Sequence, residues 1–227
     1  MPRTLDPEAH AVRRDAFVDV AQGLIQTKGY EQLSIQDVLD EVGVSKGAFY
    51  HYFDSKVGLL EAVVERMVVA ATAEMEPIVA DPNRTAVQKL NDVFSTLAQW
   101  KSDRRALVVA LIEVWISDDN AIVREKLRKG TVAHVTPLLT TIVRQGVAEG
   151  TFHTDSPAAT ARVLVSLIQG ASDVATDLVI ARKSGAISFD VVERTLTAYT
   201  SAYERVLGLP AGSWSMMDEA TLHSWFD

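Results

Sequence analysis

Along most of the chain, apolar residues recur at every third or fourth position, which is the spacing that gathers them on one face of an α-helix. The first such stripe runs from Val12 to Ile25 and predicts a helix of about five turns. Lys28 and Gly29 close it, because a cation suits a helix C-terminus and glycine accepts the backbone conformation that often follows one.

Two short helices are predicted next. Ser34 is a good N-cap, and Asp37 stands three residues later, close to the pattern of a capping box. Gly43 should end this helix after about two turns, because glycine commonly terminates helices. Ser45 then caps a compact aromatic helix over residues 48–53.

The rest of the chain predicts longer helices, with Pro77 ending the first of them and Pro137 kinking or splitting the fourth. The expected ranges are 56–75, 83–100, 104–116, 121–149, 156–183 and 188–209. No convincing strand pattern and no internal repeat are present, so we expect an all-α fold. The aromatic residues of the tail, at positions 214, 225 and 226, predict that it docks on a surface.

Composition narrows the functional classes. The chain has 227 residues, a net charge of −8 and no cysteine, which excludes disulfides, thiolate metal sites and cysteine nucleophiles. The longest unbroken apolar run, residues 106–112, is far shorter than the ~20 residues that cross a bilayer. The N-terminus has no apolar stretch like that of a signal peptide. We expect a soluble, cytoplasmic protein without membrane contact, cofactor or metal.

The segment from Ser34 to Lys56 carries the candidate chemistry. Two short helices joined by a tight glycine turn have the geometry of a helix-turn-helix, whose second helix enters the DNA major groove. Lys46 can donate to guanine or to phosphate, and the small Gly47 and Ala48 let the backbone approach bases. The spacing alone leaves a second interpretation open, in which the aromatic residues are simply core. Local charge gives no support, because residues 1–56 hold six Lys/Arg against nine Asp/Glu.

Residues 13–60 resemble the DNA-binding domain of the tetracycline-repressor-type (TetR) family. The matching features are Lys28-Gly29-Tyr30, Ser34-Ile35, Gly43-Val44-Ser45-Lys46-Gly47, Phe49-Tyr50, Tyr52-Phe53, Ser55-Lys56 and Leu59-Leu60. The remainder resembles the family only in the number and order of its helices. Val38-Leu39 departs from the pattern, since a small alanine is common there.

The resemblance implies an N-terminal three-helix helix-turn-helix domain over residues 8–56. A C-terminal helical ligand-binding and dimerisation domain would follow over residues 57–210, and the tail would comprise residues 211–227. The implied function is that of a DNA-binding transcriptional regulator. It would be a homodimeric repressor that a small, largely apolar ligand releases from a palindromic double-stranded operator.

The resemblance also assigns site residues. Those expected to approach bases or the adjacent backbone are Ser34, Gln36, Lys46, Gly47 and Ala48. Those expected to hold phosphates are Ser45, Tyr50, His51, Tyr52 and Lys56.

The family implies a dimer built from the last two long helices, each of which carries an apolar stripe. The stripe residues are Leu164, Ile168, Ala171, Ala175, Leu178, Val192, Leu196, Tyr199 and Tyr203. Both stripes could instead face only the core of one chain.

Ligand chemistry is poorly specified by the sequence. Candidate pocket residues are Phe94, Trp100, Leu111, Glu113, Trp115, His134, Leu138, Gln169 and Asp173. Taken singly, each is explained as well by packing or by solvent exposure.

Enzymes and regulators controlled by a protein partner are the two other functional classes to which the chain could belong. The chain is not expected to be an enzyme, because it has no phosphate-binding loop, dinucleotide fingerprint, HExxH or GxSxG motif. The alternative to control by a small molecule is a regulator controlled by a protein partner, which the aromatic tail could bind. Self-docking of that tail on its own chain is the competing interpretation.

Overall fold

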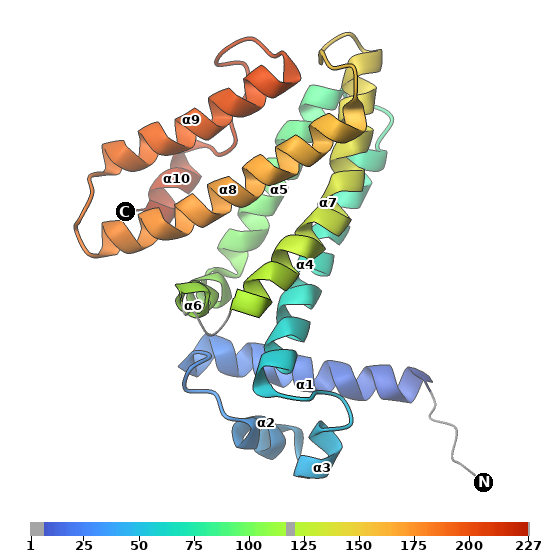
Figure 1. Cartoon of the computed structure of the whole chain (residues 1–227), viewed down its shortest axis with the longest axis vertical. Helices are drawn as coiled ribbons and strands as arrows, with labels where there is room; N and C mark the ends of the chain where they lie inside the picture. The colour runs from blue at the N-terminus through green and yellow to red at the C-terminus, as the bar shows by residue number, and fades with distance from the viewer. Residues whose placement is uncertain (1–6, 117–120, 227) are drawn as a thin grey trace. The chain divides into compact units, whose positions relative to one another are not determined.

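The computed structural model describes residues 7–116 and 121–226, without the side chains of residues 113, 115 and 116 (Figure 1). Every regular element in these residues is an α-helix, which confirms the all-α prediction. The chain divides into two compact units. Unit 1 comprises Met1–Val68 and Arg104–Leu127, and unit 2 comprises Val69–Asp103 and Arg128–Asp227.

Unit 1 contains three complete N-terminal helices, a later one, and the beginnings of two more. They are α1 (Pro7–Lys28), α2 (Ile35–Val42), α3 (Lys46–Phe49), α6 (Arg105–Ile116), the start of α4 (Lys56–Ala80) and the start of α7 (Ala121–Ala148). The expected domain boundary at residue 56 differs from this division. Leu59 and Leu60 of α4 and Leu107 of α6 are buried in the same core as α1, so these segments belong with it.

Local chemistry explains the ends of α2. Ser34 and Asp37 form a complete capping box, in which the Asp37 backbone N–H donates to Ser34 Oγ and the Ser34 backbone N–H donates to Asp37 Oδ2. Lys28, in the last turn of α1, lies 2.6 Å from the same carboxylate oxygen. Gly43 ends the helix at φ 74°, in the left-handed region that glycine adopts without a steric penalty. The predicted limits of this helix are confirmed.

The bond from Lys28 is the main reason that the pKa of Asp37 lies far below its ordinary value of 3.8, and the bonds from Ser34 add to it. The ionised carboxylate thereby joins the last turn of α1 to the first turn of α2.

Unit 2 holds the remainder of α4 and α7 together with α5 (Ala86–Asp103), α8 (Pro157–Lys183), α9 (Phe189–Leu207) and α10 (Glu219–Phe226). Its core includes Phe94, Leu139, Ile142, Leu164 and Tyr203. α8 and α9 pack against each other, and the buried Tyr203 hydroxyl donates to the Leu164 carbonyl at 2.8 Å.

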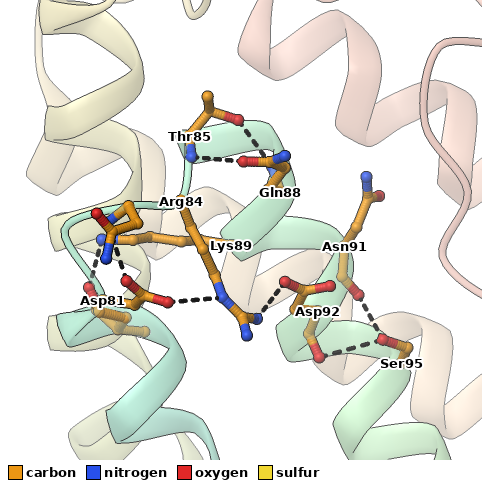
Figure 2. Close-up of polar contacts among 10 residues, drawn as sticks. Asp81, Arg84, Thr85, Gln88, Lys89, Asn91, Asp92 and Ser95 are labelled. Carbon is orange, nitrogen blue, oxygen red and sulfur yellow. Dashed lines mark hydrogen bonds and ion pairs between the residues drawn. The ribbon is translucent and has the colours of Figure 1, made fainter.

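A network of polar side chains fixes the turn between α4 and α5 (Figure 2). Arg84 donates to Asp81 at 2.9 Å and also pairs with Asp92. Thr85 and Gln88 cap the start of α5, because each backbone N–H donates to the other residue's side chain. These bonds satisfy groups that a helix end leaves unpaired and so define where the chain reverses.

Pro77 does not end α4, which continues to Ala80, so that prediction is wrong. The last turn beyond this proline is supported by Lys89, which is 4% exposed and whose ammonium donates to the Val79 carbonyl at 2.6 Å. A cation at a helix C-terminus also meets the negative end of the helix dipole. α7 is likewise continuous across Pro137, so the predicted split does not occur.

The C-terminal segment packs into unit 2. Trp214 is 4% exposed, and its ring centroid lies 4.9 Å from that of Phe94 and 5.1 Å from that of Tyr203. Its backbone N–H donates to the buried carboxylate of Glu204 at 3.1 Å. Further along, Arg182 donates to the Phe226 carbonyl at 3.0 Å. The segment docks on its own chain and completes its core.

α8 differs from the other described helices in its apolar character. By length and composition alone it is the one helix of the described residues that could cross a membrane, yet only 28% of its most apolar stretch is buried in this chain. It reaches this character without a long unbroken apolar run, because polar residues such as Ser166, Gln169 and Asp173 stand between its apolar residues.

We predict that Trp214→Ala lowers the free energy of unfolding by about 3–5 kcal/mol, because it removes a large ring from a packed core. Chemical denaturation followed by circular dichroism measures this loss. Ser213→Ala, an exposed neighbour, serves as the control and should stay within about 0.5 kcal/mol of the wild type. Equal stability of both variants and the wild type would mean that the tail is not part of the core.

We also predict a specific acid sensitivity at Asp37. Its pKa is lower in the folded than in the unfolded chain, so its interactions stabilise the fold above pH 3.8 and are lost as the pH falls below that value. The stability difference between wild type and Asp37→Asn should therefore be constant near neutral pH and shrink below pH 3.8. Urea titrations across pH measure it. Asp40→Asn, one turn later, is the control, and a pH-independent difference at Asp37 would contradict the prediction.

Candidate nucleic-acid interface

The helix-turn-helix expected from the sequence is formed by α2, the turn at Gly43 and α3 (Figure 1). The turn is closed by the backbone N–H groups of Gly43 and Val44, which donate to the Leu39 carbonyl at 2.9 and 3.1 Å. α3 is regular only over Lys46–Phe49, whereas a helix over residues 48–53 was predicted. Residues 50–52 continue as turns whose backbone N–H groups still bond three or four residues back.

One buried ring determines which side of α3 is exposed. Phe49 is completely buried, and its ring centroid lies 5.7 Å from that of Phe17, edge-on. With this ring inside, Lys46 and Gly47 lie on the surface. Tyr50 remains 47% exposed while its ring leans against Phe49 at 5.4 Å. The exposed surface of α3 therefore carries the cation of Lys46, the bare backbone of Gly47 and the phenol of Tyr50.

Three other predicted contact residues also lie near this surface. Ser45, at the N-cap of α3, and His51 are exposed, and Ala48 is half-buried. Ser45 makes no side-chain capping bond, so its hydroxyl is not engaged at the helix start. Six of the ten predicted DNA-contacting residues thus lie between positions 45 and 51, with the buried Phe49 as their support.

The residues predicted on α2 are engaged within the chain. The Ser34 hydroxyl donates to Asp37 at 2.6 Å as part of the capping box. The Gln36 amide donates to Asp40 at 2.7 Å, although both side chains remain exposed. Ser34 therefore has a structural task that its position in the family pattern does not reveal.

Tyr52 and Lys56, two of the predicted phosphate contacts, also have partners in unit 1. The Tyr52 ring packs 5.5 Å from Phe17 and 4.6 Å from His10, measured between ring centroids. The Lys56 ammonium lies 4.2 Å from the centre of the Tyr30 ring and donates to the Glu31 carbonyl at 3.3 Å.

This partial burial has electrostatic consequences. Desolvation lowers the pKa of Lys56, opposed by the charge of Glu31. Burial raises the pKa of Tyr30 to about 12, with the charges of Glu31 and Glu61 adding to the effect. Lys56 thus secures the start of α4 to the loop that precedes α2.

The candidate ligand residues are divided between the two units. Phe94, Leu138 and the buried Trp100 belong to unit 2, whereas Leu111 packs against the core of unit 1. Gln169 donates to the Arg128 carbonyl at 2.9 Å. His134 and Asp173 are exposed. The side chains of Glu113 and Trp115 lie outside the described residues.

The predicted dimer residues divide into two groups. Five are buried within one chain, namely Leu164, Ala171, Leu178, Val192 and Tyr203, so their stripe faces the core of this chain. The other four are half-buried, namely Ile168, Ala175, Leu196 and Tyr199. The sequence analysis did not include Val163 of α8, which is 48% exposed.

Comparisons with known proteins agree with this geometry. The family described as bacterial regulatory proteins, tetR family, matches residues 17–63, which span the helix-turn-helix and its supporting helices. The chain is 24% identical over 144 residues to the HTH-type transcriptional regulator EthR of Mycolicibacterium smegmatis, covering 56% of this chain and 66% of that one. It therefore spans about two thirds of that relative. It is 22% identical over 164 residues to the repressor KstR2 of Rhodococcus jostii, covering 68% and 74% of the two chains.

The similarity to one solved structure extends over most of the chain. The TetR transcription regulator from Haloarcula marismortui superposes with a TM-score of 0.62 at 22% identity, covering 87% of this chain and 97% of that one. The two curated relatives are transcriptional regulators rather than enzymes. The family match thus identifies a tetR-type DNA-binding domain at residues 17–63, and the chain shares the fold of a TetR transcription regulator.

Proposed function

We propose that the protein is a cytoplasmic homodimeric repressor that binds a palindromic operator through α3 and leaves it when a small, largely apolar ligand binds. The observation that carries the DNA-reading part is the burial of Phe49, which leaves Lys46, Gly47 and Tyr50 on one exposed surface. Lys46 would donate to a base edge, Gly47 would allow close approach of the backbone, and the Tyr50 hydroxyl would reach a phosphate.

The dimer is supported by the outer face of α8. Only 28% of the most apolar stretch of this helix is buried in one chain, and Val163 is 48% exposed. In a DNA-binding regulator, a second copy of the chain is the occupant that this apolar face fits best, because helices bury such faces against one another. Two-fold symmetry would then pair the two α3 helices with two half-sites of a palindrome.

The ligand is supported by one unpaired polar group in unit 2. The Thr136 hydroxyl oxygen is buried and has no hydrogen-bond partner, although nearly all buried polar groups in proteins have one. It lies on α7 beside Val135 and Leu138, which border the apolar core. A mostly apolar ligand with one polar group would suit such surroundings. If the ligand favours a state that binds DNA poorly, DNA must weaken ligand binding by the same factor.

Control by a protein partner at the aromatic tail has less support. Trp214 and Phe226 are buried against their own chain, so they are not available to a partner in this state.

Selection of bound duplexes from a random DNA pool tests the proposed function. A palindromic motif that binds with a steep salt dependence is the expected result, because two subunits would each displace counterions from phosphates. The absence of any enriched sequence, repeated after unfolding and refolding to remove a co-purified ligand, would overturn it.

We predict that Lys46→Ala reduces the preference for the selected site over a scrambled duplex about tenfold, because a good side-chain contact to a base is worth ~1–3 kcal/mol. Fluorescence anisotropy titrations of both duplexes measure this ratio. Lys183→Ala, at the end of α8, is the control with the same loss of charge. Unchanged ratios in both variants would show that Lys46 reads no base.

We predict that Val163→Asp converts the dimer into a monomer, raising its dissociation constant about 100-fold or more, because an unpaired carboxylate would be buried at the interface. Sedimentation velocity over a range of concentrations measures the change. Val69→Asp on α4, where the native side chain is similarly exposed at 47%, is the control and should remain dimeric. A dimer that survives Val163→Asp would place the interface elsewhere.

A further inference from the structure

The cations of the helix-turn-helix region are not all used in the same way. Between residues 7 and 68, Lys28 pairs with Asp37, and Arg66 pairs with Asp19 and also donates to Gln22. Lys56 is engaged by a backbone carbonyl. In this described part of the chain, that leaves Arg13, Arg14 and Lys46 without an ion-pair partner. Two of these three cations lie on α1, which the sequence analysis did not assign to DNA.

Arg14 differs from Arg13 in what it contacts. Its guanidinium carbon lies 5.4 Å from the centre of the Phe53 ring. Phe53 is 5% exposed and packs against Phe17 and Phe49, so the core of the helix-turn-helix fixes where this guanidinium lies. Arg13 is exposed and makes no such contact.

His10, one turn earlier on α1, also packs against an aromatic ring of the segment after α3. Its ring centroid is 4.6 Å from that of Tyr52, with the two planes tilted by 42°. Residues four apart on a helix share one face, so His10 and Arg14 form an edge along the segment that leads from α3 to α4. Tyr52, which His10 contacts, directly follows Tyr50 and His51 in the sequence, and both of these are exposed at the end of α3.

The chemistry of this edge suits a phosphate. A guanidinium that rests on an aromatic ring keeps its N–H groups directed outward from the rim of its plane, where they can form two parallel bonds to phosphate oxygens. Its fixed position lowers the entropy lost on binding. Phosphates follow one another every 3.4 Å of helix axis along a DNA strand, so a second anchor beside the α3 contacts meets the same backbone.

We propose that Arg14, with His10 beside it, is a second phosphate-binding site, which holds the DNA backbone next to the stretch held by α3. The proposal rests on the proposed function of DNA binding and adds to it a contact from α1. Because it recognises phosphate alone, the site strengthens binding to every sequence and leaves base preference unchanged.

The test compares binding of the full chain to the selected duplex and to a scrambled duplex, each at several salt concentrations. Because a bound dimer carries two copies of the site, Arg14→Gln should reduce the slope of log affinity against log salt by about 1.8 and lower affinity about 60-fold at 0.1 M salt, equally for both duplexes. Arg14→Lys keeps the charge and should keep the slope. Arg13→Gln is the matched control, with the same chemical change one residue away, and should leave the slope within about 0.3 of the wild-type value.

Each outcome separates this proposal from the proposed function. If the wild-type chain, stripped of ligand by unfolding and refolding, binds neither duplex, the proposed function itself fails. If the wild type binds but Arg14→Gln keeps its slope, the α1 site is refuted and DNA binding stands. Equal losses in Arg14→Gln and Arg13→Gln would also refute it, because they would reflect net charge alone.

Folding of the variants is checked by thermal unfolding. Should Arg14→Gln fail to fold, His10→Gln tests the same edge, with an expected 2- to 10-fold loss of affinity for both duplexes from one lost neutral hydrogen bond. An unchanged affinity in His10→Gln would then overturn the proposal.

Discussion

The surface proposed to read DNA depends on the burial of a single ring, that of Phe49. α3 has only four regular residues, and a helix of that length has no stability of its own in water. Its position comes from packing, because the Phe49 ring lies 5.7 Å from Phe17 and 5.6 Å from Phe53, between centroids. With this ring inside, Lys46 and Tyr50 lie on the surface. The geometry that meets DNA is therefore set from the core outward.

The same core explains how a chain with a net charge of −8 can hold a polyanion. Net charge acts over distances that salt screens, whereas a phosphate contact depends on the few charges within reach. Acidic partners neutralise Lys28 and Arg66, and a backbone carbonyl engages Lys56. Among the described cations between residues 7 and 68, that leaves Lys46 on α3 and Arg13 and Arg14 on α1. Local arrangement, not overall composition, decides what this region attracts.

Unit 2 is completed by its own C-terminal segment. Trp214 closes an aromatic cluster with Phe94 and Tyr203, and the buried Glu204 carboxylate receives the Trp214 backbone N–H. A buried carboxylate that lost this donor would incur a large desolvation penalty, which ties the segment firmly to α9. On α8, by contrast, Val163 is 48% exposed, and Leu167 and Ile168 are only half-buried by their own chain.

The sequence by itself determined the features that depend on nearby residues. The helices, the capping box of Ser34 and Asp37 and the left-handed turn at Gly43 follow from spacing and local hydrogen bonding. The family of the N-terminal domain follows from its resemblance to a known sequence pattern. Most of the exposed α3 residues were also predictable, because the family pattern is continuous there.

Only the tertiary structure decided which partner each apolar face meets. Helical periodicity defines a face but not its occupant, so the stripe through Leu164 and Tyr203 could not be assigned to the core or to a dimer until both residues were seen buried. The same ambiguity concealed the roles of Tyr52 and Lys56, whose partners Phe17 and Tyr30 lie far away in the sequence. It also concealed Arg14, because a cation on α1 becomes a candidate anchor only when folding brings Phe53 beneath it.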